Sequence, residues 1–203
     1  LKEKVKSKTN IKKSVNAFNE LQHRNEVYYS LFEPNTTPRW NGNVKKYKFN
    51  NNGDLVGQSL AGSVDTVIGE EGFFSDSAYS FWSDAVDGKD VTKGGAAAEL
   101  SNTRNIFIGY DVNGLPTQLT TANIDTVPLS LLQTNSTGRT NNLKWLLGID
   151  IWDDQESGSI VDANKFIADG IHTKPTVITY GGTEADPADV LFFATNLGTL
   201  HAV

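Results

Sequence analysis

Three similar turns between strand-forming runs constrain the fold of this chain more than any other feature of its sequence. Asn50-Asn51-Asn52-Gly53-Asp54 separates Val44–Phe49 from Leu55–Val56, and Asn and Gly tolerate the positive φ angles that tight hairpins need. Asn113-Gly114-Leu115 and Asn196–Leu200 repeat this pattern after other strand-forming runs. The sequence therefore predicts antiparallel hairpins and a fold that is mainly β.

Further strands are predicted where aromatic and β-branched residues are concentrated and end at Gly, Asn, Asp or Pro. These runs are Glu26–Pro34, Arg104–Tyr110, Thr176–Tyr180 and Val190–Ala194. Repeated hairpins suggest a β-propeller, whose blades are four-stranded meanders of about 40–50 residues. Because the three turns are spaced more widely than that, we expect an irregular propeller with long loop insertions; a β-sandwich is the alternative.

Three segments depart from the strand pattern. In the N-terminal arm, residues 1–25, apolar side chains recur at roughly helical spacing over residues 9–22, which predicts a short helix. Residues 80–100 suggest an elaborated connection with a helical stretch at Ala96–Leu100. Residues 116–142 are rich in Thr, Asn and Ser and are expected to form a long surface insertion. The β region is predicted to extend over residues 26–203.

Composition excludes several classes of function. The formal net charge of −6 and the pI near 5.0 oppose binding to nucleic acid, and the lysines between Lys2 and Lys13 are interpreted as a solvated arm. The absence of Cys excludes disulfides, thiol catalysis and Cys-based zinc sites within this chain. No apolar run is long enough for a membrane span and no signal peptide is recognisable. We expect the chain to be part of a longer protein.

The three histidines, His23, His172 and His201, are too scattered to form a catalytic or zinc-binding motif. No His-x-x-x-His pair and no G-x-S-x-G nucleophile motif is present. Near the ends of strands, an imidazole usually hydrogen-bonds to the backbone of a neighbouring turn. The sequence therefore predicts structural histidines and no catalytic residue.

Carboxylates gather in one segment, where Asp150, Asp153, Asp154 and Glu156 precede Ser157-Gly158-Ser159. Calcium prefers such oxygen-rich loops, but the spacing does not match the EF-hand pattern. An acidic surface loop is the favoured interpretation, and metal binding to the chain stays open.

Two glycine-containing motifs have simpler explanations than a binding site. A hairpin turn accounts for the trio Asp111, Asn113 and Gly114. The pair Gly94-Gly95 lacks the Lys of a phosphate-binding loop and the strand-to-helix context, so no nucleotide or other cofactor site is predicted.

Four tryptophans stand out among the aromatic residues: Trp40, Trp82, Trp145 and Trp152. In a β protein such residues usually pack in the core or between blades. An exposed Trp82 or Trp152 would instead indicate a surface that binds carbohydrate or protein.

Four blocks of sequence, taken together, resemble the C-terminal propeller region of the PilC/PilY family of type IV pilus assembly proteins and tip adhesins. They are Arg39-Trp40-Asn41-Gly42-Asn43-Val44-Lys45-Lys46-Tyr47; Ser80-Phe81-Trp82-Ser83 with Asp87-Gly88 and Gly94-Gly95-Ala96-Ala97; Gly170-Ile171-His172-Thr173-Lys174-Pro175; and Thr195-Asn196-Leu197-Gly198-Thr199-Leu200-His201-Ala202. They follow one another in the family's order. The sequence departs from the family pattern at Thr173, where Ser is usual, and at Leu197, where Asp is usual.

The resemblance implies the opening blades of an irregular propeller in a secreted bacterial protein at the cell surface, pilus tip or outer membrane. Such a protein is not an enzyme: it supports pilus extension against retraction and attaches to surfaces or host cells, with pilins or minor pilins and a receptor as partners. The family's calcium loop is expected downstream of Val203, so no metal ligand is carried over. The alternatives are a quinone-dependent dehydrogenase-like propeller and a carbohydrate-binding β domain.

Overall fold

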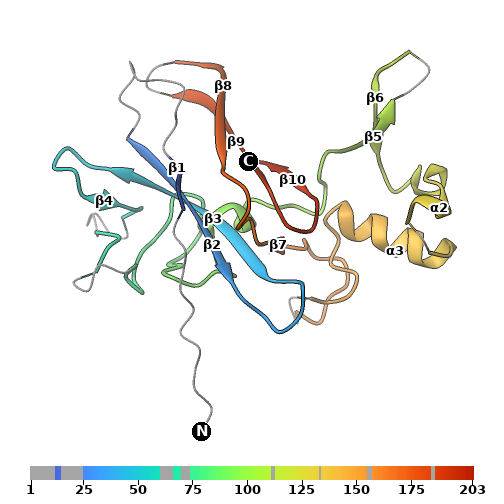
Figure 1. Cartoon of the computed structure of the whole chain (residues 1–203), viewed down its shortest axis with the longest axis horizontal. Coiled ribbons are helices and arrows are strands. Elements are labelled where there is room, and N and C mark those ends of the chain that lie inside the picture. Colours follow the sequence, from blue (N-terminus) through green and yellow to red (C-terminus); the bar gives the residue numbers. More distant parts are fainter. Residues whose placement is uncertain are drawn as a thin grey trace, which may run out of the picture. The chain divides into compact units, whose positions relative to one another are not determined.

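The computed structural model describes residues 12–14, 25–59, 66–69, 74–110, 113–132, 134–154, 157–183 and 186–203. Antiparallel strands dominate this part of the chain (Figure 1). The strands are β1 (Lys12–Ser14), β2 (Glu26–Glu33), β3 (Asn41–Phe49), β4 (Leu55–Val56), β5 (Ile106–Tyr110), β6 (Pro116–Leu119), β7 (Ile167–Ala168), β8 (Thr176–Gly182), β9 (Pro187–Ala194) and β10 (Leu200–Ala202). The helices are α1 (Gly95–Ala98), η1 (Ile124–Thr126), α2 (Leu129–Leu132) and α3 (Ser136–Leu146).

The chain divides into two compact units. Unit 1 comprises Leu1–Glu99 and Phe166–Val203, and unit 2 comprises Leu100–Lys165. Unit 2 is therefore inserted into the sequence of unit 1. The division lies within the β region predicted for residues 26–203, where the sequence indicated no boundary.

The centre of unit 1 is the long antiparallel ladder between β2 and β3, whose partners run from Glu26 opposite Lys48 to Glu33 opposite Asn41. Short strands β4 and β7 also pair with β3. Both faces of the ladder are buried, so its strands lack the simple alternation of apolar and polar residues seen in a sheet with one wet face. One face forms the core, which includes Val27, Leu31, Tyr47, Leu55, Val67, Phe74 and Ala78.

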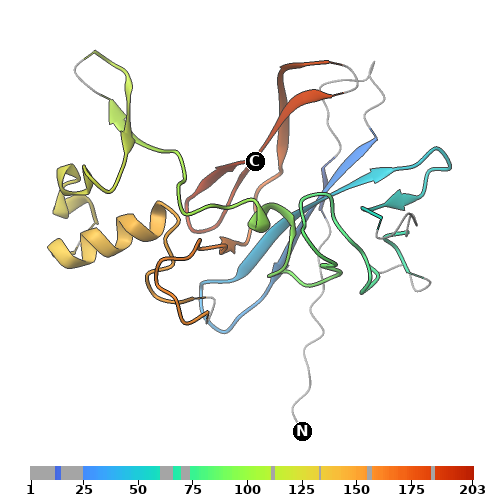
Figure 2. The same cartoon turned by 180° about the vertical axis from the view of Figure 1, so that it is seen from behind.

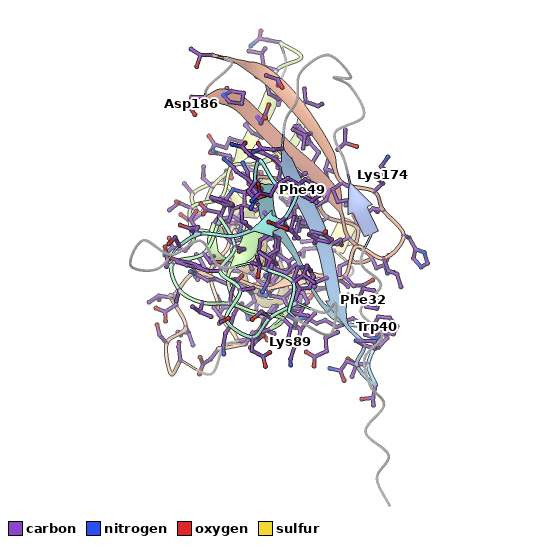
Figure 3. The ribbon with its side chains drawn as sticks, turned by 90° about the vertical axis from the view of Figure 1, so that its left-hand side faces the viewer. Phe32, Trp40, Phe49, Lys89, Lys174 and Asp186 are labelled. Atoms are coloured by element: carbon purple, nitrogen blue, oxygen red, sulfur yellow. The ribbon has the colours of Figure 1, made fainter. Side chains whose placement is uncertain are left out.

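Close packing at the start of β3 depends on a glycine. A Cβ atom on Gly42 would lie 2.6 Å from the Cα of Asp169, so no larger residue fits without moving the backbone. The glycine allows β7 to pair with β3, with Gly42 opposite Ile167. Nearby, the rings of Phe32 and Trp40 stack at 6.2 Å and lie side by side in Figure 3.

The helix predicted over residues 9–22 is wrong at Lys12–Ser14, which form β1 and pair with Tyr28–Ser30 of β2. The edge of β2 offers backbone partners there, and tertiary pairing of this kind readily overrides weak helical periodicity. The rest of the predicted helix lies outside the described residues.

The second sheet of unit 1 has the strand order β10-β9-β8. The strands predicted at Thr176–Tyr180 and Val190–Ala194 are confirmed as parts of β8 and β9, and the turn before Leu200 connects β9 to β10. One face is buried through Val177, Leu191 and Phe193. In Figure 3 the β8–β9 hairpin extends between Lys174 at one end and Asp186 at the other.

Unit 2 combines the β5–β6 hairpin with helices η1, α2 and α3, which Figure 2 shows from behind. Its core contains Leu119, Ile124, Val127, Leu143 and Leu147. The strand predicted at Arg104–Tyr110 is confirmed as β5, but residues 116–142 contain regular structure that a plain surface insertion would lack. Helix α3 was missed because it is largely polar; it starts where the Asn135 side chain accepts a hydrogen bond from Gly138 N.

The structure confirms a fold that is mainly β with long connections, and its three sheets are open. The hairpin predicted around Asn50–Asp54 is confirmed by the pairing of β3 with β4. The helical stretch expected at Ala96–Leu100 is present as α1, which starts one residue earlier and ends two residues earlier, at Ala98.

Candidate functional site

A buried ion pair lies against the core face of β3. Lys45 Nζ is 3.0 Å from Asp87 Oδ2, and the two side chains are 0% and 1% exposed. The ammonium also donates to the carbonyl oxygens of Asp87 (2.9 Å) and Gly88 (2.8 Å). Three acceptors thus match the three protons of the charged amine.

The carboxylate of Asp87 is held by further donors. Its Oδ1 accepts a hydrogen bond from Ser80 N at 2.9 Å, and its Oδ2 accepts from the hydroxyls of Ser80 (2.8 Å) and Ser83 (2.9 Å). Ser83 Oγ also accepts a hydrogen bond from Gly95 N at 2.8 Å. Because the charge is both paired and hydrogen-bonded, its burial is tolerated.

Asn43, two residues before Lys45 on the same face of β3, hydrogen-bonds to residues 91–97, which follow Asp87 and Gly88 in the chain. Its Nδ2 donates to Val91 O (3.0 Å) and Gly94 O (2.9 Å), while its Oδ1 accepts from Val44 N (2.8 Å) and Ala97 N (3.2 Å). We refer to Asn43, Lys45, Ser80, Ser83 and Asp87 as the β3 polar cluster. Every one of these side chains is buried.

Tyr47 completes this face of β3. It is fully buried, its ring stacks on Phe74 at 5.5 Å, and its hydroxyl has no hydrogen-bond partner among the residues that the structure describes. Burial, followed by the nearby charge of Asp87, raises the pKa of Tyr47. The phenol therefore stays neutral and acts as an aromatic core residue beside the cluster.

The chemistry of the β3 polar cluster is structural. Burial lowers the pKa of Lys45, and the charge and hydrogen bond of Asp87 oppose that effect. A catalytic amine or hydroxyl must reach its substrate, yet these groups are out of contact with solvent and already share their protons with one another. The cluster fixes the irregular connection 78–97 onto β3.

A second polar junction connects the two sheets of unit 1. Asp169 N donates to Trp40 O at 3.2 Å, and Asp169 O accepts from Asn196 N at 2.9 Å. The side chain of Asn196 also donates to the carboxylate of Asp169. Thr173 Oγ1 donates to Ala194 O at 2.6 Å. The turn between β9 and β10 is thereby anchored to the segment after β7.

The histidines that the structure describes are not brought together. His172 is exposed on a turn. His201 lies in β10, where its ring stacks on Phe193 at 5.0 Å and its Nε2 is 3.0 Å from Thr199 Oγ1. This contact is with a turn residue, but it goes to the side-chain hydroxyl of Thr199 and not to the backbone as predicted. His23 lies outside the described residues.

The acidic segment of unit 2 folds into a loop held by its own hydrogen bonds. Asp150 is buried and accepts a hydrogen bond from Asp154 N, while Ser157 donates to both Asp153 and Asp162. Among the described residues, no three His, Cys, Asp or Glu side chains are arranged as metal ligands. Glu156 and Asp111 lie outside the described residues.

The tryptophans divide between packing and exposure. Trp40 and Trp82 are partly buried: Trp40 stacks on Phe32, and Trp82 lies 5.5 Å from the ring of Tyr28. Trp145 is partly buried in unit 2, and Trp152 is half exposed beside it. Trp152 alone fits the expectation of an exposed indole.

Sequence reasoning missed the β3 polar cluster. In Asn41–Phe49, lysines and asparagines occupy both faces of the strand, so alternation alone does not show that Asn43 and Lys45 face the core. Gly94-Gly95 provides backbone groups that bond to this cluster: Gly94 O accepts from Asn43 Nδ2 and Gly95 N donates to Ser83 Oγ. Gly95 has φ +59, and an added Cβ would lie 2.7 Å from Val44 O of β3.

Comparison with known proteins finds no matching protein-family model, no significant match among curated proteins and none among solved structures. Within the described part of the chain, no helix has the length and apolar character needed to cross a membrane.

Proposed function

We propose that this chain is a non-enzymatic scaffold and adhesin part of a type IV pilus-associated protein, built from the opening blades of an irregular β-propeller. The protein would be secreted, act at the bacterial surface or pilus tip, bind pilins or minor pilins and contact a surface or host receptor. The observation that carries the proposal is that residues of the four sequence blocks of the PilC/PilY resemblance, or residues directly next to them, take part in the two polar junctions of unit 1.

The bonds of these junctions link the first block to the second, and link the first and fourth blocks to the residue that precedes the third. Lys45 of the first block pairs with Asp87 of the second. Asp169, immediately before the third block, accepts a hydrogen bond from Asn196 of the fourth and donates to Trp40 of the first. Several block residues thus make contacts that hold the fold together, while the blocks also contain exposed turn residues such as His172 and Leu197.

The β10-β9-β8 sheet supports the propeller part of the proposal. Its buried side carries Val177, Leu191 and Phe193, together with Thr179, Asp189 and His201. By strand register and alternation, the opposite face is largely apolar and carries Thr176, Ile178, Tyr180, Val190, Phe192, Ala194, Leu200 and Ala202. A sheet with apolar side chains on both faces is suited to lie between two other layers, as a blade does. A single-layer sheet at the surface would carry charged residues there.

Deletion of the gene in a type IV-piliated bacterium tests the proposal. We expect surface pili and attachment to be lost in a strain that retracts its pili, pili to return when the retraction motor is also removed, and the intact gene to restore both. Electron microscopy and an adhesion assay give the two readouts. Normal piliation and attachment in the deletion strain would refute the proposed function.

A further inference from the structure

Two indoles of unit 2 lie close together, with Trp152 half exposed and Trp145 partly buried. The ring centroids of Trp145, on α3, and Trp152 are 6.3 Å apart with an interplanar angle of 42°. Trp145 Nε1 donates to Asp154 Oδ2 at 3.2 Å. Trp152 leaves 50% of its surface in solvent, although a tryptophan is usually largely buried.

The described residues next to Trp152 are held by hydrogen bonds within their own segment. Buried Asp150 accepts a hydrogen bond from Asp154 N at 2.9 Å and donates its own N–H to Asp162 O at 2.9 Å. Asp153, with φ +52, accepts Gly158 N at 3.1 Å. An aromatic residue held on such a loop loses little conformational entropy on binding, which favours recognition through its ring.

The carboxylates of the segment that carries Trp152 suit neutral hydroxyls. Asp153 and Asp162 already accept hydrogen bonds from Ser157, and Asp162 also accepts from Ser159. A carboxylate engaged in this way has lone pairs left to accept a hydrogen bond from a hydroxyl. The negative charge of these side chains repels anionic ligands.

We propose that Trp152, supported by Trp145, binds a neutral oligosaccharide by stacking on the C–H face of a pyranose ring, with sugar hydroxyls donating to the neighbouring carboxylates. An amphipathic sugar presents both surfaces that this site matches: apolar C–H groups to an indole and hydroxyls to oxygen acceptors. The inference rests on the proposed adhesin function for its biological meaning, and it specifies the ligand class as an uncharged glycan rather than a sialylated or sulfated one.

The test is an array of neutral oligosaccharides and their sialylated counterparts, probed with the full chain and followed by titration of each neutral binder. Trp152→Ala should weaken binding of a neutral glycan at least about tenfold, because loss of a central stacking ring removes most of a small interface. Trp152→Phe should retain part of the affinity, which separates lost stacking from a damaged loop. Tyr180→Ala, which removes a 66% exposed ring from unit 1, should leave binding within about twofold. Each sialylated counterpart should bind more weakly than its neutral parent.

The inference is overturned if no neutral glycan on the array is bound, or if wild type and Trp152→Ala bind equally well. So does salt-sensitive binding of polylysine that depends on Trp152, which would indicate a cationic partner instead. The pilus function is judged separately: a strain carrying Trp152→Ala should make normal numbers of pili and lose only glycan-dependent attachment. Glycan binding without any piliation defect in the deletion strain would refute the proposed function and support this site. A piliation defect in the deletion strain without glycan binding would support the proposed function and refute this site.

Discussion

Removing the charge of Lys45 should destabilise unit 1 strongly. Lys45→Met keeps most of the side-chain length but leaves Asp87, 1% exposed, without its counter-charge. It also removes the donor that the carbonyls of Asp87 and Gly88 share. Breaking a buried ion pair from one side costs about 3–5 kcal/mol, a large part of the stability of an ordinary domain. Lys89→Met is the matched control, because Lys89 pairs with Asp76 while 69% exposed, and should cost at most about 1 kcal/mol.

The double variant Lys45→Met with Asp87→Asn distinguishes a charge effect from a packing effect. Neutralising both partners removes the uncompensated buried charge, so the double variant should be more stable than Lys45→Met alone. Urea unfolding followed by tryptophan fluorescence measures each free energy. Replacing Trp145 and Trp152 by Phe in every variant confines the signal to unit 1, which contains Trp40 and Trp82.

Two results would contradict this reasoning. If Lys45→Met costs no more than Lys89→Met, the buried pair does not hold the connection 78–97 onto β3. If the double variant loses as much free energy of unfolding as Lys45→Met and Asp87→Asn lose separately and added together, the two side chains act independently. The cluster is then not organised by their charges.

Three further predictions concern unit 1. Burial raises the pKa of Glu26, but hydrogen bonds from Lys46 and Tyr28 and the charges of Lys46 and Lys48 outweigh burial and lower this pKa below 4.5. The resulting stabilisation is present above the pKa of Glu26 in the unfolded chain and is lost as the pH falls through its pKa in the folded protein. Glu26→Gln should therefore flatten the acid limb of a stability–pH curve, and an unchanged acid limb would contradict this prediction. Tyr47→Phe should leave stability unchanged or raise it by up to about 1 kcal/mol in urea unfolding, because its buried hydroxyl has no partner in the described part of the chain. A loss of stability of about 1 kcal/mol or more would contradict this and show that the hydroxyl is hydrogen-bonded. Gly42→Ala should cost about 1–3 kcal/mol of stability, because the added Cβ meets backbone, and it should weaken the hydrogen-exchange protection of β7. Gly53→Ala is the control: its Cβ enters open space, so the φ of +85 alone should cost about 1–2 kcal/mol and leave the protection of β7 unchanged.

Local chemistry in the sequence determined the hairpins and most long strands. Asn50–Asp54 encodes its own turn, because Asn50 Oδ1 accepts hydrogen bonds from the N–H groups of Asn52 and Asp54 whatever surrounds the loop. The β-branched and aromatic runs in β2, β8 and β9 likewise prefer extended backbone for local steric reasons. Acidic charge and missing cysteines are also read directly from the sequence.

Other features depend on contacts between distant residues, and the sequence could not show them. Lys12–Ser14 became a strand because β2 supplied an edge, and helix α3 is held by Leu143 in a core built with Leu119 and Ile124. Lys45 could be recognised as buried only once Asp87, far along the chain, was beside it. A lysine is normally solvated, and its partner, not its own strand, decides whether the interior can hold its charge.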